Sequence, residues 1–185
     1  FLQHRVADLR ILRLIQKWLK AGVMEDGQRS ETEMGTPQGS GISPLLANIY
    51  LHYVFDLWVD AWRKKCAQGD VIVVRYADDS VLGFQHQAEA DRFLEDLRGR
   101  LKKFGLDLHP DKIFLKTIAS GMDFLGWVHF PRHRVLRTKT KERMMKRVVQ
   151  NPTEATLQSY LGMSGHGDTY QLSAHLKNDY WLFAG

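Results

Sequence analysis

The stretch that decides the fold reads Val71-Ile72-Val73-Val74-Arg75-Tyr76-Ala77-Asp78-Asp79-Ser80-Val81-Leu82-Gly83-Phe84. Residues 71–75 form a β-branched run and residues 81–84 a second apolar run, and both patterns favour strands. The segment between them leaves room only for a tight turn. The sequence therefore predicts an antiparallel hairpin that carries the carboxylates of Asp78 and Asp79 at its tight end.

The paired carboxylates make this turn a candidate site. Two adjacent carboxylates repel each other, and a divalent cation relieves the repulsion. Mg²⁺ takes oxygen ligands, usually one or two carboxylates together with substrate phosphates. Two ions held in this way carry out in-line phosphoryl transfer in polymerases. An Asp-Asp pair taken alone is more often a simple polar turn, so both interpretations stay open at this point.

Helical spacing of apolar residues occurs on both sides of the hairpin. Residues 5–21 follow a 3.6-residue period, and Gly22 stands where such a helix would end. Ser43-Pro44 is typical of an N-cap followed by proline at the first helical position, and it precedes a long apolar helix through Lys65. Residues 87–104 return to helical spacing before Gly105.

The remaining elements complete an α+β pattern. Short strands are expected around residues 113–117 and 123–130, and a further helix is expected to start at Asn151-Pro152. The order helix, strand, strand, helix, strand, strand predicts an antiparallel sheet with helices on one face.

The composition suits a folded domain in a reducing compartment. Of the 185 residues 44% are hydrophobic, which allows a sizeable core. Cys66 is the only cysteine, which excludes an internal disulfide framework and a cysteine metal cluster. No apolar run reaches the roughly 20 residues needed to span a bilayer, so no membrane partner is expected. The net charge of +5 fits a polyanionic partner, but many cytosolic proteins are equally basic.

A second candidate site is the glycine-rich segment Gly35-Thr36-Pro37-Gln38-Gly39. Glycines let the backbone approach a ligand closely, and Gln38 offers both a donor and an acceptor. The segment leads into the predicted helix N-terminus at Ser43, a natural place for phosphate. Taken alone, such a segment is more often an ordinary loop.

Five short motifs in this order resemble those of bacterial reverse transcriptases, above all the group II intron-encoded enzymes and their relatives. In chain order they are Gly35-Thr36-Pro37-Gln38-Gly39, Ser43-Pro44-Leu45, Tyr76-Ala77-Asp78-Asp79, Gly105-Leu106 with Pro110-Asp111-Lys112, and Phe124-Leu125-Gly126-Trp127. The resemblance implies a polymerase palm in residues 1–130. It also implies the start of a mostly helical, basic thumb or a connecting region in residues 131–185, and a place in the bacterial cytoplasm.

The resemblance assigns catalytic roles by position. Asp78 and Asp79 match the palm carboxylates that bind two Mg²⁺ ions, with Mn²⁺ as a substitute, and Asp78 is the firmer ligand. Lys112 matches a lysine that approaches the pyrophosphate leaving group as a general acid. The alternative for Lys112 is a solvated surface lysine. The implied reaction is transfer of a nucleotide from a dNTP to a primer 3′-OH, templated by RNA.

The resemblance also implies contacts with an RNA template, a DNA primer and dNTPs. Gln38 matches a residue that lies against the nascent base pair and the template. Pro37, Gly39 and Tyr76 belong to the same substrate-binding set. The residues matched to the hairpin that supports the primer 3′ end, a role compatible with core packing, are Phe124, Leu125, Gly126 and Trp127.

One metal ligand of the family has no match in this chain. The family places another aspartate upstream, on a strand followed by aromatic residues. The chain begins at Phe1 without a starting Met, which indicates a piece of a longer protein that lacks the fingers and the first catalytic strand. Asp8 lies on a predicted helix and does not match. We therefore expect the chain alone to be inactive as a polymerase.

The segment from Arg132 to Arg147 is strongly basic, with eight cations and a single anion, Glu142. Such a run is usually a solvated face. Its place directly after the primer-support motif favours contact with nucleic acid phosphates, which makes binding sensitive to salt. The residues nominated for these contacts are Arg134, Arg137, Lys139 and Lys141.

Residues 159–170 resemble a segment that follows the palm in some bacterial reverse transcriptases. Within it, His166 and Asp168 could be taken for a metal-binding pair. Two ligands without a third partner are weak evidence for a metal site, and a helix cap or a turn is favoured.

Two rival functions stay open. One is a non-enzymatic, maturase-like splicing cofactor that binds intron RNA, and the intact Asp78-Asp79 pair argues against selection for binding alone. The other is an RNA-dependent RNA polymerase palm, although Tyr76-Ala77-Asp78-Asp79 favours reverse transcription over the Gly-Asp-Asp usual there. The sequence does not indicate an oligomeric state.

Overall fold

The computed structural model describes residues 1–20, 23–25, 28–30 and 41–184, and it divides the chain into two compact units. The first unit is Phe1–Ile113 and the second is Phe114–Gly185. Both combine helices with small antiparallel sheets, which confirms the predicted α+β class. Within the described part, no helix is long and apolar enough to cross a bilayer.

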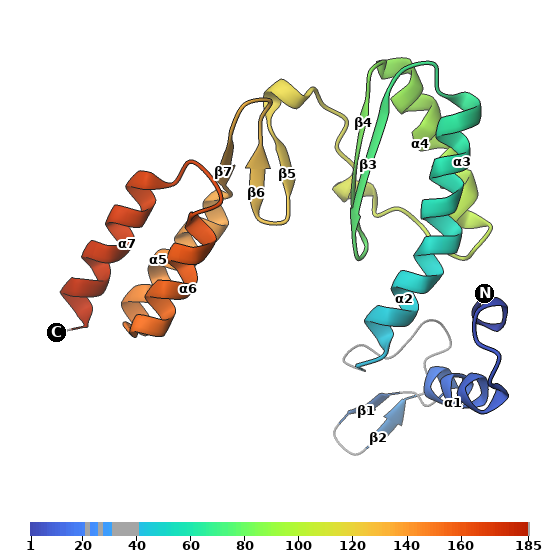
Figure 1. The fold of residues 1–185 in the computed structure, drawn as a ribbon, viewed down its shortest axis with the longest axis horizontal. Coiled ribbons are helices and arrows are strands. Elements are labelled where there is room, and N and C mark those ends of the chain that lie inside the picture. The colour runs from blue at the N-terminus through green and yellow to red at the C-terminus, as the bar shows by residue number, and fades with distance from the viewer. Residues whose placement is uncertain (21–22, 26–27, 31–40, 185) are drawn as a thin grey trace. The chain divides into compact units, whose positions relative to one another are not determined.

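The first unit contains two hairpins and four α-helices among its described residues (Figure 1). The 3₁₀ turn η1 and the helix α1 come first, followed by the antiparallel pair β1 and β2. Their bounds, with those of the following elements, are η1 Leu2–His4, α1 Leu9–Lys20, β1 Val23–Glu25, β2 Gln28–Ser30, α2 Ser43–Leu51, the π-helical segment η2 His52–Asp56, α3 Leu57–Cys66, β3 Val71–Tyr76, β4 Asp79–Phe84, α4 Gln87–Lys102 and the 3₁₀ turn η3 Pro110–Lys112.

The core of the first unit lies between the β3–β4 hairpin and the helices that cover one of its faces, α3 and α4 (Figure 1). Side chains alternate across a strand, so every second residue of β3 points toward the helices. Val71 is buried on that face, whereas Ile72, Val74 and Tyr76 on the other face are exposed. The buried core side chains are Val54, Phe55, Val59, Trp62, Val71, Phe93, Leu97 and Leu101.

The long helix predicted from residue 43 is present, with one π-helical turn inside it. It begins at Ser43 with Ile42 at the N-cap, and Pro44 stands in the first turn. In the π segment the backbone N–H of Leu57 donates to the carbonyl of His52, five residues earlier. Arg100 of α4 donates from Nε to the carbonyl of Val54 at 3.0 Å and so supports this irregular turn from the neighbouring helix.

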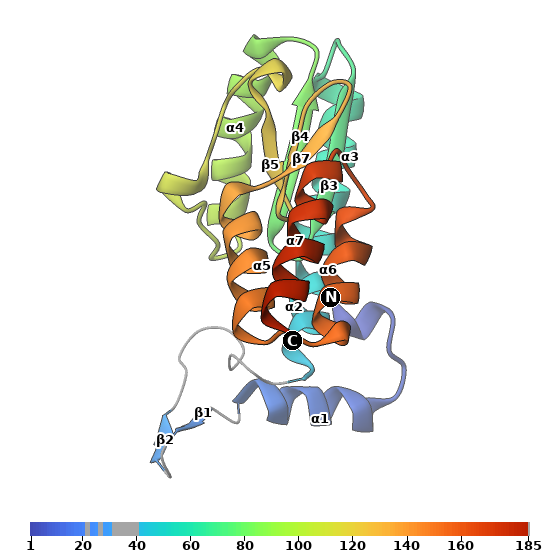
Figure 2. The same cartoon turned by 90° about the vertical axis from the view of Figure 1, so that its left-hand side faces the viewer.

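The second unit is a three-stranded sheet followed by three helices that lie side by side in Figures 1 and 2. Its sheet is antiparallel in the order β5-β6-β7. The bounds are η4 Ile118–Ser120, β5 Met122–Phe124, β6 Trp127–His129, β7 Arg134–Leu136, α5 Thr138–Gln150, α6 Glu154–Ser164 and α7 Tyr170–Phe183. The second compact unit therefore includes this sheet, because Trp127 and Leu136 pack with the helices.

Three predicted elements differ from the structure, and one strand was not predicted. The strand expected at 113–117 does not form, and those residues run without regular structure into η4. The strand expected at 123–130 is a hairpin, β5–β6, closed by Leu125 and Gly126. The helix expected from residue 5 begins at Leu9, and β7 was not predicted at all.

The turn between β5 and β6 explains why periodicity suggested a single strand. Leu125 and Gly126 have φ angles of 51° and 83°, the positive values that a two-residue type I′ loop requires. Such loops usually carry Asn-Gly or Asp-Gly, and leucine is unfavourable in that conformation. The apolar Phe124-Leu125-Gly126-Trp127 run therefore concealed a turn.

Trp127 also fixes the turn that joins α6 to α7. A side chain at Gly167 would overlap the indole ring of Trp127 and would stand 3.0 Å from the carbonyl oxygen of Arg134. The backbone N–H of Asp168 donates to that same carbonyl at 3.1 Å. Glycine at 167 is thus a packing requirement that joins the sheet to the helices.

We expect Gly167→Ala to lower the free energy of unfolding by about 1–3 kcal/mol, because it over-packs a site whose neighbours are a buried ring and backbone. The matched control is Gly162→Ala in α6, where an added methyl group meets nothing within 4 Å. It should be neutral or slightly stabilising, since alanine favours helices over glycine. Urea unfolding of both variants gives the comparison, and equal stability of the two would contradict the packing role.

Candidate active site

The two carboxylates lie at the tip of the β3–β4 hairpin, as the sequence predicted. Tyr76 pairs with Asp79, so Ala77 and Asp78 form the two-residue loop. Ala77 has a φ of 53°, the positive value that the first position of some tight hairpin loops requires. Asp78 and Asp79 are both exposed. The tip therefore presents two adjacent carboxylates to solvent.

The donor set fits a hard cation that is shared with a substrate. Among the described residues, no group of three or more His, Cys, Asp or Glu side chains could enclose a metal ion. Mg²⁺ does not need such an enclosure, because it is commonly held by one or two carboxylates together with phosphate oxygens and water. Asp78 and Asp79 are the described residues that fit this kind of binding at the turn.

An arginine on the helix-facing side of the hairpin connects the turn to the long helix. The guanidinium of Arg75 donates from Nε to Oδ1 of Asp56 and from Nη2 to Oδ2, each at 2.7 Å. This is the two-point arrangement in which an arginine pairs most strongly with a carboxylate. The pair is largely enclosed, since the Arg75 side chain is 14% exposed and that of Asp56 is 32% exposed.

The remaining nitrogen of the Arg75 guanidinium binds the turn itself. Nη1 donates to the carbonyl oxygen of Ala77 at 2.6 Å and to Oδ1 of Asn48 at 2.8 Å. The side chain of Arg75 is therefore hydrogen-bonded to residues of α2, the π-helical segment and the hairpin loop. Ala77 directly precedes Asp78, so this contact is one residue from the candidate metal ligand.

The ion pair shifts the ionisation of both partners. Hydrogen bonds from Arg75 lower the pKa of Asp56 below its usual value, against the opposing effect of partial burial. His52 adds a smaller contribution from Nδ1, which lies 3.3 Å from Oδ2 of Asp56. The pKa of Arg75 is raised in turn by its hydrogen bond to Asp56. Asp56 is therefore held as a carboxylate and Arg75 as a cation.

Asp56 and Asn48 were not among the predicted site residues, and Arg75 had no predicted ligand role. One signal was present: Arg75 continues the alternation of Val71 and Val73, so it shares the helix-facing side of the strand. A charged residue at a core-facing position requires a partner. The pattern did not reveal which residue that partner would be.

The other predicted site residues fall in several places. Pro37, Gln38 and Gly39 lie outside the described residues. Tyr76 is exposed beside the turn, and Lys112 is exposed in η3 of the first unit. The predicted primer-support residues belong to the second unit, where Leu125 is exposed, Trp127 is buried, and Phe124 and Gly126 are half-buried.

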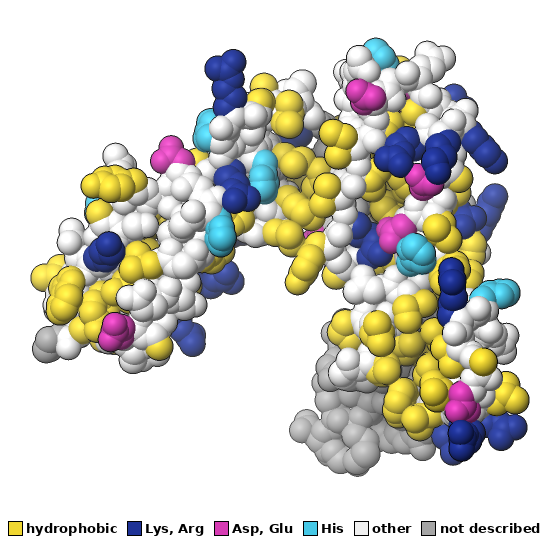
Figure 3. Space-filling view, viewed as in Figure 1, with side chains coloured by type: hydrophobic (Ala, Val, Ile, Leu, Met, Phe, Trp, Pro, Cys, Tyr) yellow, Lys and Arg dark blue, Asp and Glu magenta, His cyan; other side chains and the backbone are white. Residues whose placement is uncertain are grey.

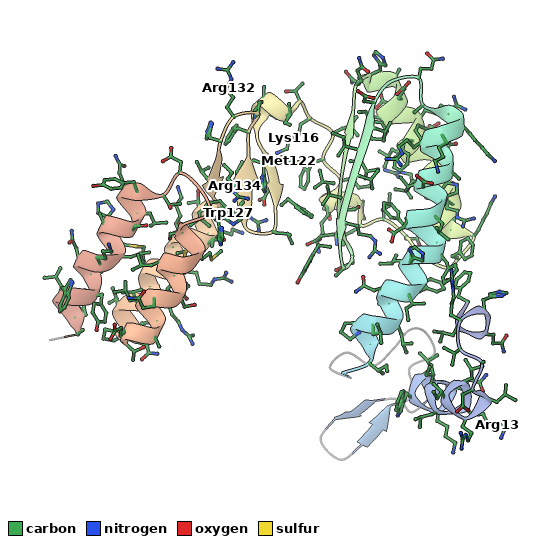
Figure 4. All side chains as sticks on the ribbon, in the orientation of Figure 1. Arg13, Lys116, Met122, Trp127, Arg132 and Arg134 are labelled. Carbon is green, nitrogen blue, oxygen red and sulfur yellow. The ribbon has the colours of Figure 1, made fainter. Side chains whose placement is uncertain are left out.

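Two of the four nominated basic residues take part in contacts within the second unit. Arg134 donates from Nε to the carbonyl of His166, and its guanidinium lies 5.2 Å from the ring centre of Trp127 (Figure 4). Arg137 forms an ion pair with Asp123. Lys139 is exposed on α5, while Lys141 is half-buried.

Three of the exposed cations of α5 follow one side of the helix. Lys139, Arg143 and Lys146 are spaced at i, i+4 and i+7, and all three are exposed. The buried side of the same helix carries Thr140, Met144 and Val148. We call Lys139, Arg143 and Lys146 the basic stripe.

His166 and Asp168 lie in the turn between α6 and α7. The N–H of His166 donates to the carbonyl of Met163, and the N–H of Asp168 donates to the carbonyl of Arg134. Their backbone N–H groups thus take part in the turn that joins α6 to α7.

Comparison with known proteins identifies the family. The family model described as "Reverse transcriptase (RNA-dependent DNA polymerase)" matches residues 2–129, which include the Asp78–Asp79 turn. The chain belongs to the reverse transcriptase family. The predicted family resemblance is thereby confirmed.

Several known proteins are similar to this chain over shorter or longer stretches. Protein YkfC of Escherichia coli is 32% identical over 183 residues, covering 82% of this chain and 45% of that protein. The group II intron-encoded protein LtrA of Lactococcus lactis is 54% identical over 48 residues, 26% of this chain and 8% of that protein. The putative COX1/OXI3 intron 2 protein of Saccharomyces cerevisiae is 24% identical over 182 residues, 68% of this chain and 21% of that protein. The chain thus spans less than half the length of these relatives.

The Asp56–Arg75 pair should make stability depend on pH in the acid range. Because the folded-state pKa of Asp56 is lowered, its stabilisation is fully present above the unfolded value of about 3.9 and is lost as the pH falls through the folded value. We expect Asp56→Asn to lower the free energy of unfolding at pH 7 by about 1–3 kcal/mol.

Urea unfolding from pH 7 down to the acid limit measures this effect. The difference between the unmodified protein and Asp56→Asn should shrink below pH 4. Asp60→Asn is the matched control on the same helix, because the ion pairs of Asp60 with Arg63 and Lys64 are solvent-exposed. A cost of Asp56→Asn that stays constant over the whole pH range would contradict the assignment.

Proposed function

We propose that this chain supplies the metal-binding turn of an enzyme that synthesises DNA on an RNA template. The observation that carries the proposal is the Asp78–Asp79 pair at the tip of a tight hairpin, within the segment that matches the reverse transcriptase family. The reaction is attack of a primer 3′-OH on the α-phosphate of a dNTP, with release of pyrophosphate.

The carboxylates of Asp78 and Asp79 are the residues that would hold the metal. When bound, two Mg²⁺ ions, or Mn²⁺ in their place, would lower the barrier to in-line displacement by stabilising the attacking and leaving oxygens. Asp78 lies in the two-residue loop and Asp79 directly after it at the start of β4, and both are exposed, which suits ligands that must meet triphosphate oxygens. Complete catalysis also requires the upstream aspartate that the family resemblance implies.

Other residues take roles in the proposal by their match to the family. Lys112, exposed in η3, is the candidate proton donor to the leaving pyrophosphate. Gln38 is the candidate contact to the template and the nascent base pair. Trp127 and its neighbours on the β5–β6 hairpin are the candidate support for the primer. These roles extend the proposal and are independent of the metal-binding turn.

Nucleic acid binding in this proposal depends on the basic stripe. Exposed cations at one side of a helix can contact successive phosphates and release counterions, so binding falls with rising salt. Lys139, Arg143 and Lys146 are better placed for this than Arg137, whose guanidinium is paired with Asp123. Lys139 is the nominated residue that is exposed on α5.

A second candidate function is non-enzymatic binding of intron RNA. It is favoured by the likeness to proteins named as intron-encoded. The Asp78–Asp79 turn distinguishes the two functions, because carboxylates do not favour a polyanion unless a cation lies between them. An RNA-dependent RNA polymerase is distinguished from a reverse transcriptase by supplying either ribonucleotides or deoxyribonucleotides in the extension assay.

We expect Asp78→Asn to abolish primer extension on an RNA template while RNA binding is largely retained, since only a metal ligand is lost. The assay uses the protein as its complete gene encodes it, with dNTPs and Mg²⁺. The matched control is Asp70→Asn, the same change at the opposite end of the same hairpin, where an exposed aspartate precedes β3. Normal primer extension by Asp78→Asn would contradict the assignment of Asp78 as a metal ligand.

The basic stripe predicts a change in salt dependence. Replacing Lys139, Arg143 and Lys146 with Gln should reduce the slope of log affinity for RNA against log salt by about one unit per lost phosphate contact. The control replaces three exposed lysines of the first unit, Lys65, Lys102 and Lys103, with Gln, which gives the same change in net charge. An unchanged slope in the stripe variant would exclude these contacts.

A further inference from the structure

Arg75 links the loop of the β3–β4 hairpin to the long helix α2–η2–α3 through hydrogen bonds. We propose that Arg75 is a positioning residue: paired with Asp56 and bonded to Asn48, it holds the carbonyl of Ala77 and so determines where the Asp78 and Asp79 carboxylates stand. This inference rests on the proposed function of the turn as a metal site.

The hairpin tip needs an anchor outside its own strands. The β3–β4 pair has two strands, and its loop is exposed, so the tip is the part of the hairpin most prone to open locally. The long helix provides a firm base, because Val54 and Phe55 of its π segment and Val59 of α3 are buried in the core. Through Arg75, the loop backbone is held against this buried helix.

The Asp56 carboxylate keeps Arg75 available for the loop carbonyl. A guanidinium this close to Asp78 and Asp79 could instead pair with them and compete with a metal ion for their oxygens. Both oxygens of Asp56 accept from Nε and Nη2, which leaves Nη1 to bind Ala77 and Asn48. The positive charge of Arg75 is therefore neutralised by the Asp56 carboxylate of the long helix, and the carboxylates of Asp78 and Asp79 remain available to a cation.

The geometry requires arginine and not just a positive charge. Arg75 donates four hydrogen bonds from three nitrogens to two side chains and one carbonyl. A lysine ammonium is a single point donor on a flexible chain and cannot reproduce this planar fork. Arg75→Lys therefore keeps the charge but loses the arrangement, and it serves as the conservative variant.

The π-helical turn is part of the arrangement. Asn48 and Asp56 are eight residues apart, which in a regular α-helix corresponds to roughly 80° of rotation around the axis. The π segment His52–Asp56 begins after Asn48 and ends with Asp56, so it changes that rotation, and both side chains meet the same guanidinium. Insertions of this kind occur often at functional sites.

We call the four hydrogen bonds of Arg75 to Asp56, Asn48 and Ala77 the clamp. Loss of the clamp should affect the chemical step more than binding of the template–primer. A displacement of reacting groups by about 1 Å can reduce the rate about 100-fold. For Arg75→Gln we expect kcat to fall by at least about tenfold, the Mg²⁺ concentration for half-maximal rate to rise, and KM for the template–primer to stay within about twofold. Asn48→Ala, which removes one of the four bonds, should produce a smaller change in the same direction.

The experiment compares Arg75→Gln, Arg75→Lys and Asn48→Ala with the unmodified protein encoded by the complete gene. Arg63→Gln is the matched control, since Arg63 forms an exposed ion pair with Asp60 on the same helix and is not bonded to the hairpin. Three quantities are measured: steady-state extension over a range of Mg²⁺, binding of Mn²⁺ alone by electron paramagnetic resonance, and amide hydrogen exchange over residues 76–80.

Support for the clamp is weaker Mn²⁺ binding and faster exchange at residues 76–80, by at least about tenfold, in Arg75→Gln and Arg75→Lys but not in Arg63→Gln. If Arg75→Gln does not fold, Arg75→Lys and Asn48→Ala give the same comparison. Exchange and Mn²⁺ affinity equal to those of the unmodified protein in these variants overturn the inference.

The readouts separate this inference from the proposed function. If the unmodified protein extends no primer, the proposed function fails, while hydrogen exchange still decides whether Arg75 holds the turn. If extension is normal and depends on Asp78 but the Arg75 variants keep their kcat and Mg²⁺ requirement, the function stands and the clamp fails. A loss of activity that is fully explained by fewer folded molecules, with unchanged Mg²⁺ dependence, also rejects the positioning role.

Discussion

Burial of one face of the β3–β4 hairpin against α3 and α4 is the constraint on which the rest of the first unit depends. Because side chains alternate along a strand, covering one face determines the direction of every residue in the hairpin. Val71 is buried toward the helices, and Arg75 is carried to the same side, where Asp56 meets it. A slip of one residue would turn Arg75 to the exposed face and leave Asp56 without its cation.

The site therefore combines an exposed hairpin tip with a helix that is anchored in the core. The proposed metal ligands Asp78 and Asp79 have to be accessible to a substrate, and an accessible two-residue loop has few packing contacts of its own. Charge-assisted hydrogen bonds instead hold the loop to a helix whose π segment buries Val54 and Phe55 in the core. The second unit shows the same principle without a catalytic group, because Gly167 and Arg134 both pack on the buried ring of Trp127.

The exposed surface of the second unit has two different characters. The basic stripe of α5 suits a polyanion. Near the C-terminal end of α7, hydrophobic side chains gather on the surface (Figure 3), and those of Trp181, Leu182 and Phe183 are exposed. Arg132, by contrast, projects from the connection between β6 and β7 (Figure 4). Charge on this unit is thus distributed over exposed positions, while Arg134 and Arg137 also serve its internal structure.

The sequence by itself determined the hairpin, the place of Asp78 and Asp79 at its tip, the long helix after Ser43 and the end of α4 before Gly105, whose φ is 67°. These features depend on local propensity and on the period of apolar residues, and both can be read from residues that are close together in the sequence. Only the tertiary structure decided the partners of Arg75, which are 19 and 27 residues away along the chain. It also decided the need for glycine at 167, whereas the Leu125–Gly126 turn was indicated by the family resemblance and not by the period of apolar residues. A hydrogen bond or a close approach between distant segments depends on how whole elements pack, and no local pattern of residues carries that information.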